Sequence, residues 1–196
     1  MHKYEKRDGL RQATAVMTVF ETREAENGGK HISGYFAVFG STYNLSPWES
    51  ESIAPGAFRS SLANNDIRAL TNHDTTLVLG RTTAGTLTLK EDDHGLWGDI
   101  TVNEQDGDAM NTWARVQRGD VSQCSFGFYI RDEQVDYRPD GGVHFTLLDV
   151  DLREVSVCTF PAYPATDIAA RSAERAEARR QELESWKESI RRKLKC

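Results

Sequence analysis

The sequence predicts a mainly β protein with a few helices (α+β), whose short strands form an antiparallel barrel or sandwich. Runs of β-branched and aromatic residues recur at short intervals between residues 15 and 160, and turn-forming Gly, Pro, Asn and Asp residues separate them. About seven or eight such runs stand against one or two helical patterns. Many short strands joined by turns are typical of antiparallel sheets rather than of parallel sheets with helical crossovers.

The expected strands are residues 15–20, 31–39, 76–79, 85–90, 96–102, 120–130, 143–148 and 152–158. Residues 85–90 alternate leucine with threonine or lysine, as a strand with one buried face does. Residues 91–95 and 139–142 carry the turn residues of two hairpins. Gly34, inside an aromatic run, predicts a bulge or a barrel bend.

Two helices are expected between these strands. The stronger pattern runs from Asp106 to Arg118, where Asp106 or Asp108 can cap the N-terminus and Gly119 can stop the C-terminus. Its apolar stripe contains Met110, Trp113 and Val116 or Gln117. A shorter helix is expected at residues 58–62, after an apolar turn.

The composition divides the chain into three regions. Residues 1–14 form a polar leader, residues 15–167 hold the expected strands, and residues 168–196 form a charged helix without Gly or Pro. Its apolar residues, Leu183, Trp186, Ile190 and Leu194, follow one narrow stripe. This C-terminal amphipathic helix carries nine basic and five acidic residues from Ala169 onward. We expect it either to lean on the core or to serve in docking or dimerisation.

Composition argues against several classes of function. The net charge of −6 lacks the basic footprint of general nucleic-acid binding, and no apolar run approaches the ~20 residues of a membrane helix. The three cysteines have no CxxC spacing, so a reducing cytoplasm is expected rather than a disulfide framework or a zinc knuckle. His73 with His94 or His144 could supply metal ligands, but no HExxH spacing anchors such a site. No phosphate or dinucleotide loop is present, and we expect neither a cofactor nor a metal.

Residues 120–130 (DVSQCSFGFYI) contain the candidate nucleophile of a hydrolytic site. Ser122 and Ser125 lead into an aromatic strand, and Gly127 lets a substrate backbone approach closely. Cys124 is a rival nucleophile, but its sequence neighbours offer no cation to lower its pKa. Residue type and position leave these three open.

A serine nucleophile needs a base and a group that orients the base. His73 is the best base, because it lies at a loop–strand junction between Asn72 and Asp74. The other histidines are terminal, in a strand or in an acidic turn.

The orienting acid is expected on the acidic strand that begins at Asp149. Glu154 lies between Leu152 and Val155, where an unpaired carboxylate is costly, and this favours Glu154 over Asp149 and Asp151. Regular alternation along the strand would place Glu154 on the same face as Leu152.

Taken together, these motifs resemble the prohead (capsid maturation) serine proteases of tailed phages. The matching segments, in family order, are residues 34–39 (GYFAVF), 51–58 (ESIAPGAF), 67–74 (IRALTNHD), 79–81 (LGR), 85–87 (GTL), 95–96 (GL), 125–128 (SFGF) and 152–162 (LREVSVCTFPA). Each segment is weak by itself, but the ordered set covers about residues 15–165 and is specific.

The resemblance implies a herpesvirus-protease-like fold, an antiparallel β-barrel of about seven strands wrapped by helices. It places the family histidine on His73 and the family serine on Ser125, with Glu154 where herpesvirus enzymes use a histidine. Backbone N–H groups near Phe126 or a neighbouring loop would hold the oxyanion, with Arg153 assisting.

The resemblance also implies partners and a place of action. We expect an endopeptidase that acts inside the prohead, in the bacterial host cytoplasm. It would cleave the scaffold segment and N-terminal extension of the major capsid protein, and itself, and a homo-oligomer such as a dimer is expected. The alternatives are a non-catalytic capsid assembly or scaffold-binding factor and a lipocalin-like ligand barrel, neither of which needs both His73 and Ser125.

Overall fold

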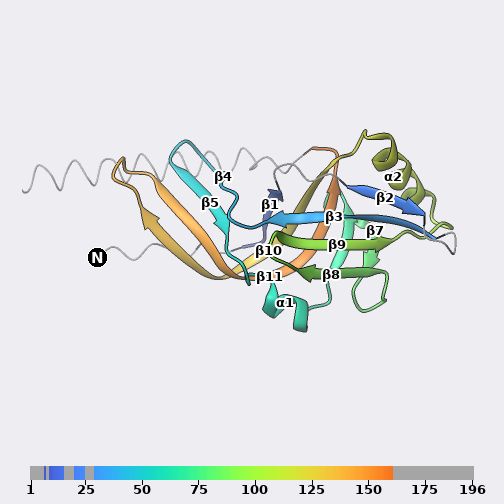
Figure 1. Ribbon diagram of the computed structural model, residues 1–196, viewed down its shortest axis with the longest axis horizontal. Helices are drawn as coiled ribbons and strands as arrows, with labels where there is room; N and C mark the ends of the chain where they lie inside the picture. The colour runs from blue at the N-terminus through green and yellow to red at the C-terminus, as the bar shows by residue number, and fades with distance from the viewer. Residues whose placement is uncertain (1–6, 8, 16–19, 25–28, 161–196) are drawn as a thin grey trace, which may run out of the picture.

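The computed structural model describes residues 7, 9–15, 20–24 and 29–160, whose strands form two sheets (Figure 1). The larger sheet contains β1 (Arg11–Ala15), β4 (Tyr43–Asn44), β5 (Glu49–Ile53), β6 (Arg68–Thr71), β7 (Asp74–Arg81), β10 (Gln123–Tyr137) and β11 (Val143–Cys158). The smaller sheet contains β2 (Glu21–Glu24), β3 (Lys30–Val38), β8 (Leu87–Glu91) and β9 (Gly95–Thr101). The helices are α1 (Arg59–Asn64) and α2 (Gly107–Arg118).

A long hairpin, β10 and β11, is the centre of the larger sheet. The outer halves of its strands extend beyond the main core as an arm that β5 and β4 join (Figure 1). Leu45, Val143 and Phe145 form a separate small apolar cluster on this arm. The expected mainly β fold is confirmed, but the strands of the described residues do not close into one barrel. Strands of 15 and 16 residues are longer than the hairpin that the sequence predicts, and they carry the sheet past the core.

The pairing of β11 is mixed rather than purely antiparallel. One edge is antiparallel to β10, whereas β5 and β6 pair in parallel with successive parts of the other edge. The chain returns from β5 to β6 through α1, and such a crossover permits parallel pairing. This arrangement brings the end of β6 beside the end of β11.

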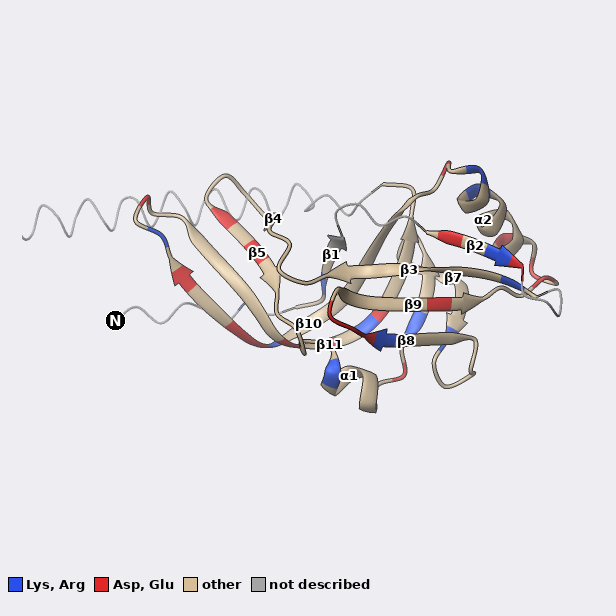
Figure 2. Ribbon diagram, viewed as in Figure 1, with Lys and Arg blue, Asp and Glu red and all other residues tan. Residues whose placement is uncertain are grey.

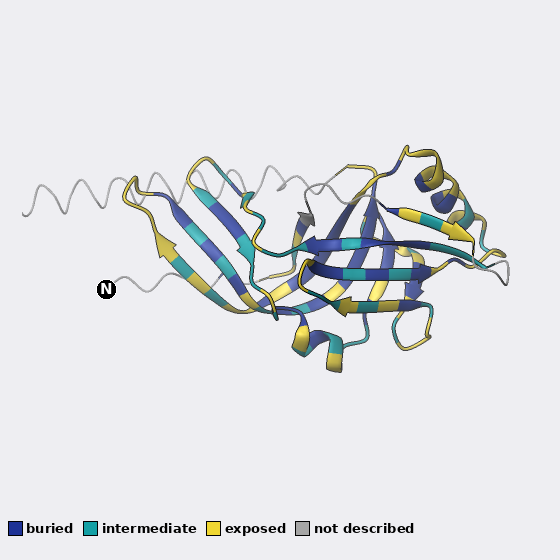
Figure 3. Cartoon of the chain, viewed as in Figure 1, coloured by how far each residue is buried: buried dark blue, intermediate teal, exposed yellow. Residues whose placement is uncertain are grey.

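The main core lies where the two sheets pack on each other, and its largest members are aromatic. Phe36, Phe58, Phe126 and Phe128 are fully buried, and burial of each such ring is worth about 1.5–3 kcal/mol. The inner halves of β10 and β11 are largely buried, whereas the arm is half exposed (Figure 3). Charged residues concentrate on the arm, on exposed strand positions and at the ends of elements (Figure 2).

Both helices expected between the strands are confirmed, at α1 and α2. Asp106 caps α2 by accepting the backbone N–H groups of Asp108 and Ala109, and Gly119 ends the helix with a left-handed φ of 85°. Trp113 and Val116 face the core. Neither helix of the described residues has the length and apolar character needed to cross a membrane.

The segment expected to be a polar leader contributes to the sheet. Residues 11–15 form β1, which pairs with β10 from Phe128 to Cys124 and covers an edge that would otherwise be unpaired. Arg7 is also buried, between Glu51 and Glu133 on the arm. The expected helix at 168–196 lies outside the described residues, as does most of the expected strand at 15–20.

Candidate active site

His73 lies in a tight turn between β6 and β7. Asn72 and His73 both have left-handed backbones, with φ of 52° and 60°, a conformation that costs non-glycine residues free energy. Asn72 secures the turn, because its backbone N–H donates to the Val157 carbonyl at 2.9 Å and its side-chain oxygen accepts the Thr159 N–H at 2.8 Å. The turn that carries His73 is therefore fixed to the end of β11.

Asp74, the third residue of the NHD motif, binds Thr76 at the start of β7 instead of contacting His73. Its carboxylate accepts the hydroxyl of Thr76 at 2.6 Å and the backbone N–H of Thr76 at 2.8 Å. These hydrogen bonds hold the pKa of Asp74 below its ordinary value. The motif thus combines Asn72, which secures the turn, the candidate base His73, and Asp74, which stabilises the start of β7.

A bulge at Arg153 sets the direction of Glu154. In the strand register Glu154 is opposite Gly127, whereas Leu152 is opposite Phe128, so Arg153 is an extra residue on β11. Leu152 and Val155 are both buried in the core, and Glu154 points to the other face. The expectation that Glu154 shares a face with Leu152 is wrong, because the bulge interrupts regular alternation.

His73 and Glu154 form a hydrogen-bonded pair. The distance from His73 Nδ1 to Glu154 Oε1 is 2.6 Å, and the side chains are 14% and 12% exposed. A carboxylate at Nδ1 favours the tautomer with the proton on Nδ1, which leaves Nε2 as an acceptor. Nε2 is buried and makes no hydrogen bond within the described part of the chain. It is therefore available to accept a proton.

Gly127 supplies the space for this pair. A Cβ atom at position 127 would lie 2.3 Å from Glu154 Oε1, a separation that real Cβ atoms do not show. The glycine of the SFGF motif therefore accommodates the carboxylate, in addition to the substrate approach that the sequence suggests.

Ser125 lies on β10, directly opposite Ser156 of β11, whose hydroxyl contacts both His73 and Glu154. The Ser125 side chain is fully buried, and its Oγ donates to the carbonyl of Ala13 on β1 at 2.9 Å. The structure places Ser125 beside the His73–Glu154 pair, with its hydroxyl hydrogen-bonded to β1 and not to His73.

The rival nucleophiles lie elsewhere. Cys124 is buried, and its thiol donates to the Tyr35 carbonyl at 3.0 Å, away from His73. Ser122 is exposed in the loop before β10. Burial raises the pKa of the Cys158 thiol to about 12, and the nearby Cys124 and Glu154 contribute in the same direction. Neither cysteine has the environment of an activated thiolate.

The other candidate acids, Asp149 and Asp151, and the candidate oxyanion residue Arg153 make their contacts away from His73. Asp149 accepts the Ser60 hydroxyl at the start of α1, and Asp151 accepts Asn65 Nδ2 at 2.6 Å. The side chain of Arg153 is 56% exposed and lies 3.7 Å from Asp151, so it does not support the expected assistance at the oxyanion.

The Phe126 side chain belongs to the core, and its backbone runs between β1 and β11. Its ring is stacked 5.0 Å from Phe128, measured between centroids. In the register, Phe126 is opposite Ala13 on one side and Val155 on the other.

Among the described histidines, only His73 is paired with a glutamate. His31 contacts Asp99 at 2.9 Å, His144 lies between the hydroxyls of Ser50 and Ser52, and the His94 ring packs edge-on against Tyr35. His31 is thus also paired with a carboxylate, and what distinguishes His73 among the described histidines is a buried Nε2 without a hydrogen bond.

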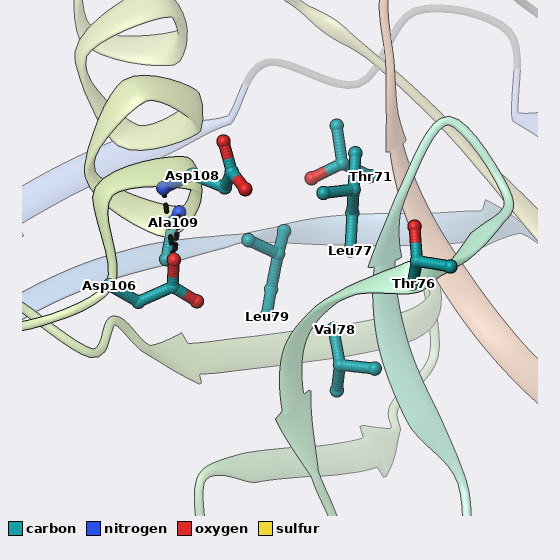
Figure 4. A pocket seen from close by; sticks show the side chains of 8 residues that line it. All are labelled: Thr71, Thr76, Leu77, Val78, Leu79, Asp106, Asp108 and Ala109. Carbon is teal, nitrogen blue, oxygen red and sulfur yellow. Dashed lines mark hydrogen bonds between the residues drawn. The ribbon is translucent and has the colours of Figure 1, made fainter.

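A small open pocket lies between β7 and the N-terminus of α2 (Figure 4). It is lined by Thr71, Thr76, Leu77, Val78, Leu79, Asp106, Asp108 and Ala109. Thr71 ends the strand that leads into the His73 turn, so the pocket adjoins the candidate site. The Asp106 carboxylate is engaged in capping α2, as the dashed lines show.

Sequence reasoning missed two parts of the site, the β1 carbonyl that binds Ser125 and the hydroxyl of Ser156. The signal for Ser156 was its spacing of two residues from Glu154, which places both on one strand face. No comparable signal marked Ala13.

A serine on the strand next to a buried histidine–carboxylate pair is an arrangement typical of serine hydrolases. The sequence profile described as caudovirus prohead serine protease matches residues 18–181, and the chain belongs to this family. The resemblance inferred from the ordered motifs is thereby confirmed.

One relative and one solved structure accompany this match. The prohead protease of Enterobacteria phage HK97 is 31% identical over 171 residues, which cover 85% of this chain and 73% of that protein. The structure of the bacteriophage T4 capsid assembly protease, gp21, is matched with a TM-score of 0.45 and 12% identity, over 76% of this chain and 96% of that chain.

Proposed function

We propose that this chain is a serine endopeptidase in which Ser125 is the nucleophile, His73 the general base and Glu154 the orienting acid. The observation that carries the proposal is the 2.6 Å contact between His73 Nδ1 and Glu154 Oε1. Among the described residues, Nε2 is left buried and without a hydrogen bond, and Ser125 lies on β10, which pairs with the strand that carries Glu154. A histidine held in this way is the base that a serine nucleophile requires.

The reaction proceeds through an acyl-enzyme. Ser125 Oγ bonds to the scissile carbonyl carbon while its proton passes to His73 Nε2, and Glu154 stabilises the imidazolium. The imidazolium then gives the proton to the leaving amine as the peptide C–N bond breaks. A water molecule, deprotonated by His73, releases the acyl group and restores the serine. Backbone N–H groups near Phe126 or in a neighbouring loop hold the oxyanion.

The mechanism requires two local changes from the arrangement described. The Ser125 hydroxyl donates to the Ala13 carbonyl, so it must turn to Nε2 before the attack. Rotation about a single side-chain bond changes the partner of a serine hydroxyl without moving the strand. The burial of Ser125 under β1 also means that β1 must shift where the substrate enters.

The substrates are proposed to be the major capsid protein, through its scaffold segment and N-terminal extension, and the protease chain itself. Membership of the prohead protease family and the name of the HK97 relative support this proposal. Cleavage would take place inside the prohead, in the cytoplasm of the bacterial host. The basic helix expected at residues 168–196 would dock the protease on capsid or scaffold protein, or join two copies.

Co-expression with the capsid protein of the same phage tests this proposal. Mass spectrometry of both proteins should find capsid-protein fragments with the wild-type chain and none with Ser125→Ala. Ser122→Ala and Cys124→Ala are the matched controls, and both should leave the fragments unchanged. Full processing by Ser125→Ala, or loss of processing in either control with the fold intact, would reject the assignment. Ending the chain after Ala170 should impair packaging more than peptide cleavage.

A further inference from the structure

Ser156 contacts two members of the site, His73 and Glu154. It is fully buried on β11. Its hydroxyl donates to Glu154 Oε2 at 2.6 Å and accepts the backbone N–H of His73 at 3.2 Å. A hydroxyl can donate and accept at the same time, and here both capacities are used.

The first contact fixes the orientation of the carboxylate. Glu154 Oε1 accepts His73 Nδ1, and Glu154 Oε2 accepts the Ser156 hydroxyl, so both oxygens are engaged. A carboxylate held at both oxygens has one rotational position. Without the hydroxyl, Oε2 would be a poorly satisfied buried acceptor, and the group would turn toward other donors.

The second contact fixes the backbone of the base relative to the same carboxylate. His73 has a left-handed φ of 60°, which needs support from surrounding contacts. The hydrogen bond from its N–H to Ser156 supplies one such contact. Glu154 and Ser156 are two residues apart on one strand face, so the same hydroxyl relates the histidine main chain to the acid that holds its ring.

We propose that Ser156 is a positioning residue of the site, acting on His73 through both the carboxylate and the turn. This inference rests on the proposed function, and it assigns Ser156 no contact with the substrate. The site is then a closed ring of hydrogen bonds: Ser156 and the His73 ring both donate to Glu154, and the His73 backbone N–H donates to Ser156. Residues 153–156 (REVS) supply the bulge at Arg153, the carboxylate of Glu154 and the hydroxyl of Ser156.

The test is steady-state kinetics on a quenched-fluorescence peptide that spans the capsid-protein cleavage site mapped by mass spectrometry. Ser156→Ala should lower kcat roughly 10- to 100-fold, because hydrogen bonds to a charged group and to a strained turn are lost together. KM should stay within about twofold, because Ser156 does not meet the substrate. An unchanged kcat would overturn the proposal.

A matched control separates positioning from general destabilisation. Ser61 is equally buried, and it also bonds to β11 by donating to the Val150 carbonyl and accepting the Leu152 N–H. Ser61→Ala should lower Tm comparably and leave kcat unchanged. An equal loss of kcat in both variants would attribute the effect of Ser156→Ala to stability and overturn the proposal.

A double-mutant cycle with Glu154→Ala tests whether Ser156 acts through the acid. In the Glu154→Ala background, removing the Ser156 hydroxyl should cost no more than about threefold in kcat. Additive losses would contradict coupling between the two residues.

The His73 Nδ1 proton gives a readout that needs no substrate. We expect a low-field resonance for this hydrogen-bonded proton in the NMR spectrum of the full chain, shifted or broadened in Ser156→Ala and unchanged in Ser61→Ala. No change in Ser156→Ala would overturn the positioning role. The proposed function itself is decided by cleavage in Ser125→Ala, Ser122→Ala and Cys124→Ala, none of which alters Ser156, so the two failures are distinguishable.

Discussion

Gly127→Ala tests the role of the His73–Glu154 pair, because the added methyl group would disturb Glu154 rather than the core. The added Cβ would lie 2.3 Å from Glu154 Oε1, whereas ordinary van der Waals contact begins at 3.4 Å, so the carboxylate must retreat by about 1 Å. That movement lengthens a 2.6 Å contact to the limit of a hydrogen bond. The atom displaced is the end of a flexible side chain, and we therefore expect the protein to stay folded.

The magnitude of the effect on kcat follows from this displacement. A misplacement of about 1 Å in a catalytic group can cost ~10²-fold, and complete loss of the orienting carboxylate costs roughly 10⁴-fold. Gly127→Ala should therefore lower kcat by about 10²- to 10⁴-fold, with KM little changed. The assay is turnover of the mapped cleavage-site peptide, with Tm measured in parallel.

Gly107→Ala is the matched control, because a Cβ at position 107 would meet nothing within 4 Å. It should retain wild-type kcat. If Gly127→Ala also keeps wild-type kcat, the carboxylate does not orient the base and the reasoning is refuted.

Two further predictions concern the structure outside the site. Arg7→Ala should lower the free energy of unfolding by about 3–5 kcal/mol, because it leaves the buried carboxylates of Glu51 and Glu133 without their cation. An unchanged urea midpoint would show that the Arg7 ion pairs contribute no stability. The second prediction is a dependence of stability on pH through Asp66. Hydrogen bonds from Arg81 hold the pKa of Asp66 well below its ordinary value. It therefore contributes stability above its unfolded pKa of about 3.9 and loses it as the pH falls toward the folded pKa. Asp66→Asn should flatten this part of the Tm–pH curve, and an unaltered curve would disprove the linkage.

Local signals in the sequence predicted local structure well. The cap at Asp106, the stop at Gly119 and the periodic stripe between them defined α2, because capping and helix periodicity depend on neighbours in the chain. The hairpin of β8 and β9 was predicted from alternation and a turn for the same reason. Residue type and position also brought forward His73 and Glu154, which the structure joins by a hydrogen bond.

Features that depend on distant pairing could not be predicted. The bulge at Arg153 is visible only in the register with β10, and it alone decides that Glu154 faces away from Leu152. The place of β1 beside Ser125 depends on a contact between residues 112 positions apart. Parallel pairing of β5 and β6 with β11 likewise leaves no periodic mark in either segment.

The central claim is that Ser125 is a nucleophile activated by His73, and cleavage by Ser125→Ala tests it most directly. The purified full-length variant and the wild-type chain would be incubated with the capsid protein, and the fragments quantified by mass spectrometry over time. The account predicts a loss of roughly 10⁶-fold in turnover, with Tm and the low-field His73 proton retained. Fragments that appear at the wild-type rate with Ser125→Ala would contradict it.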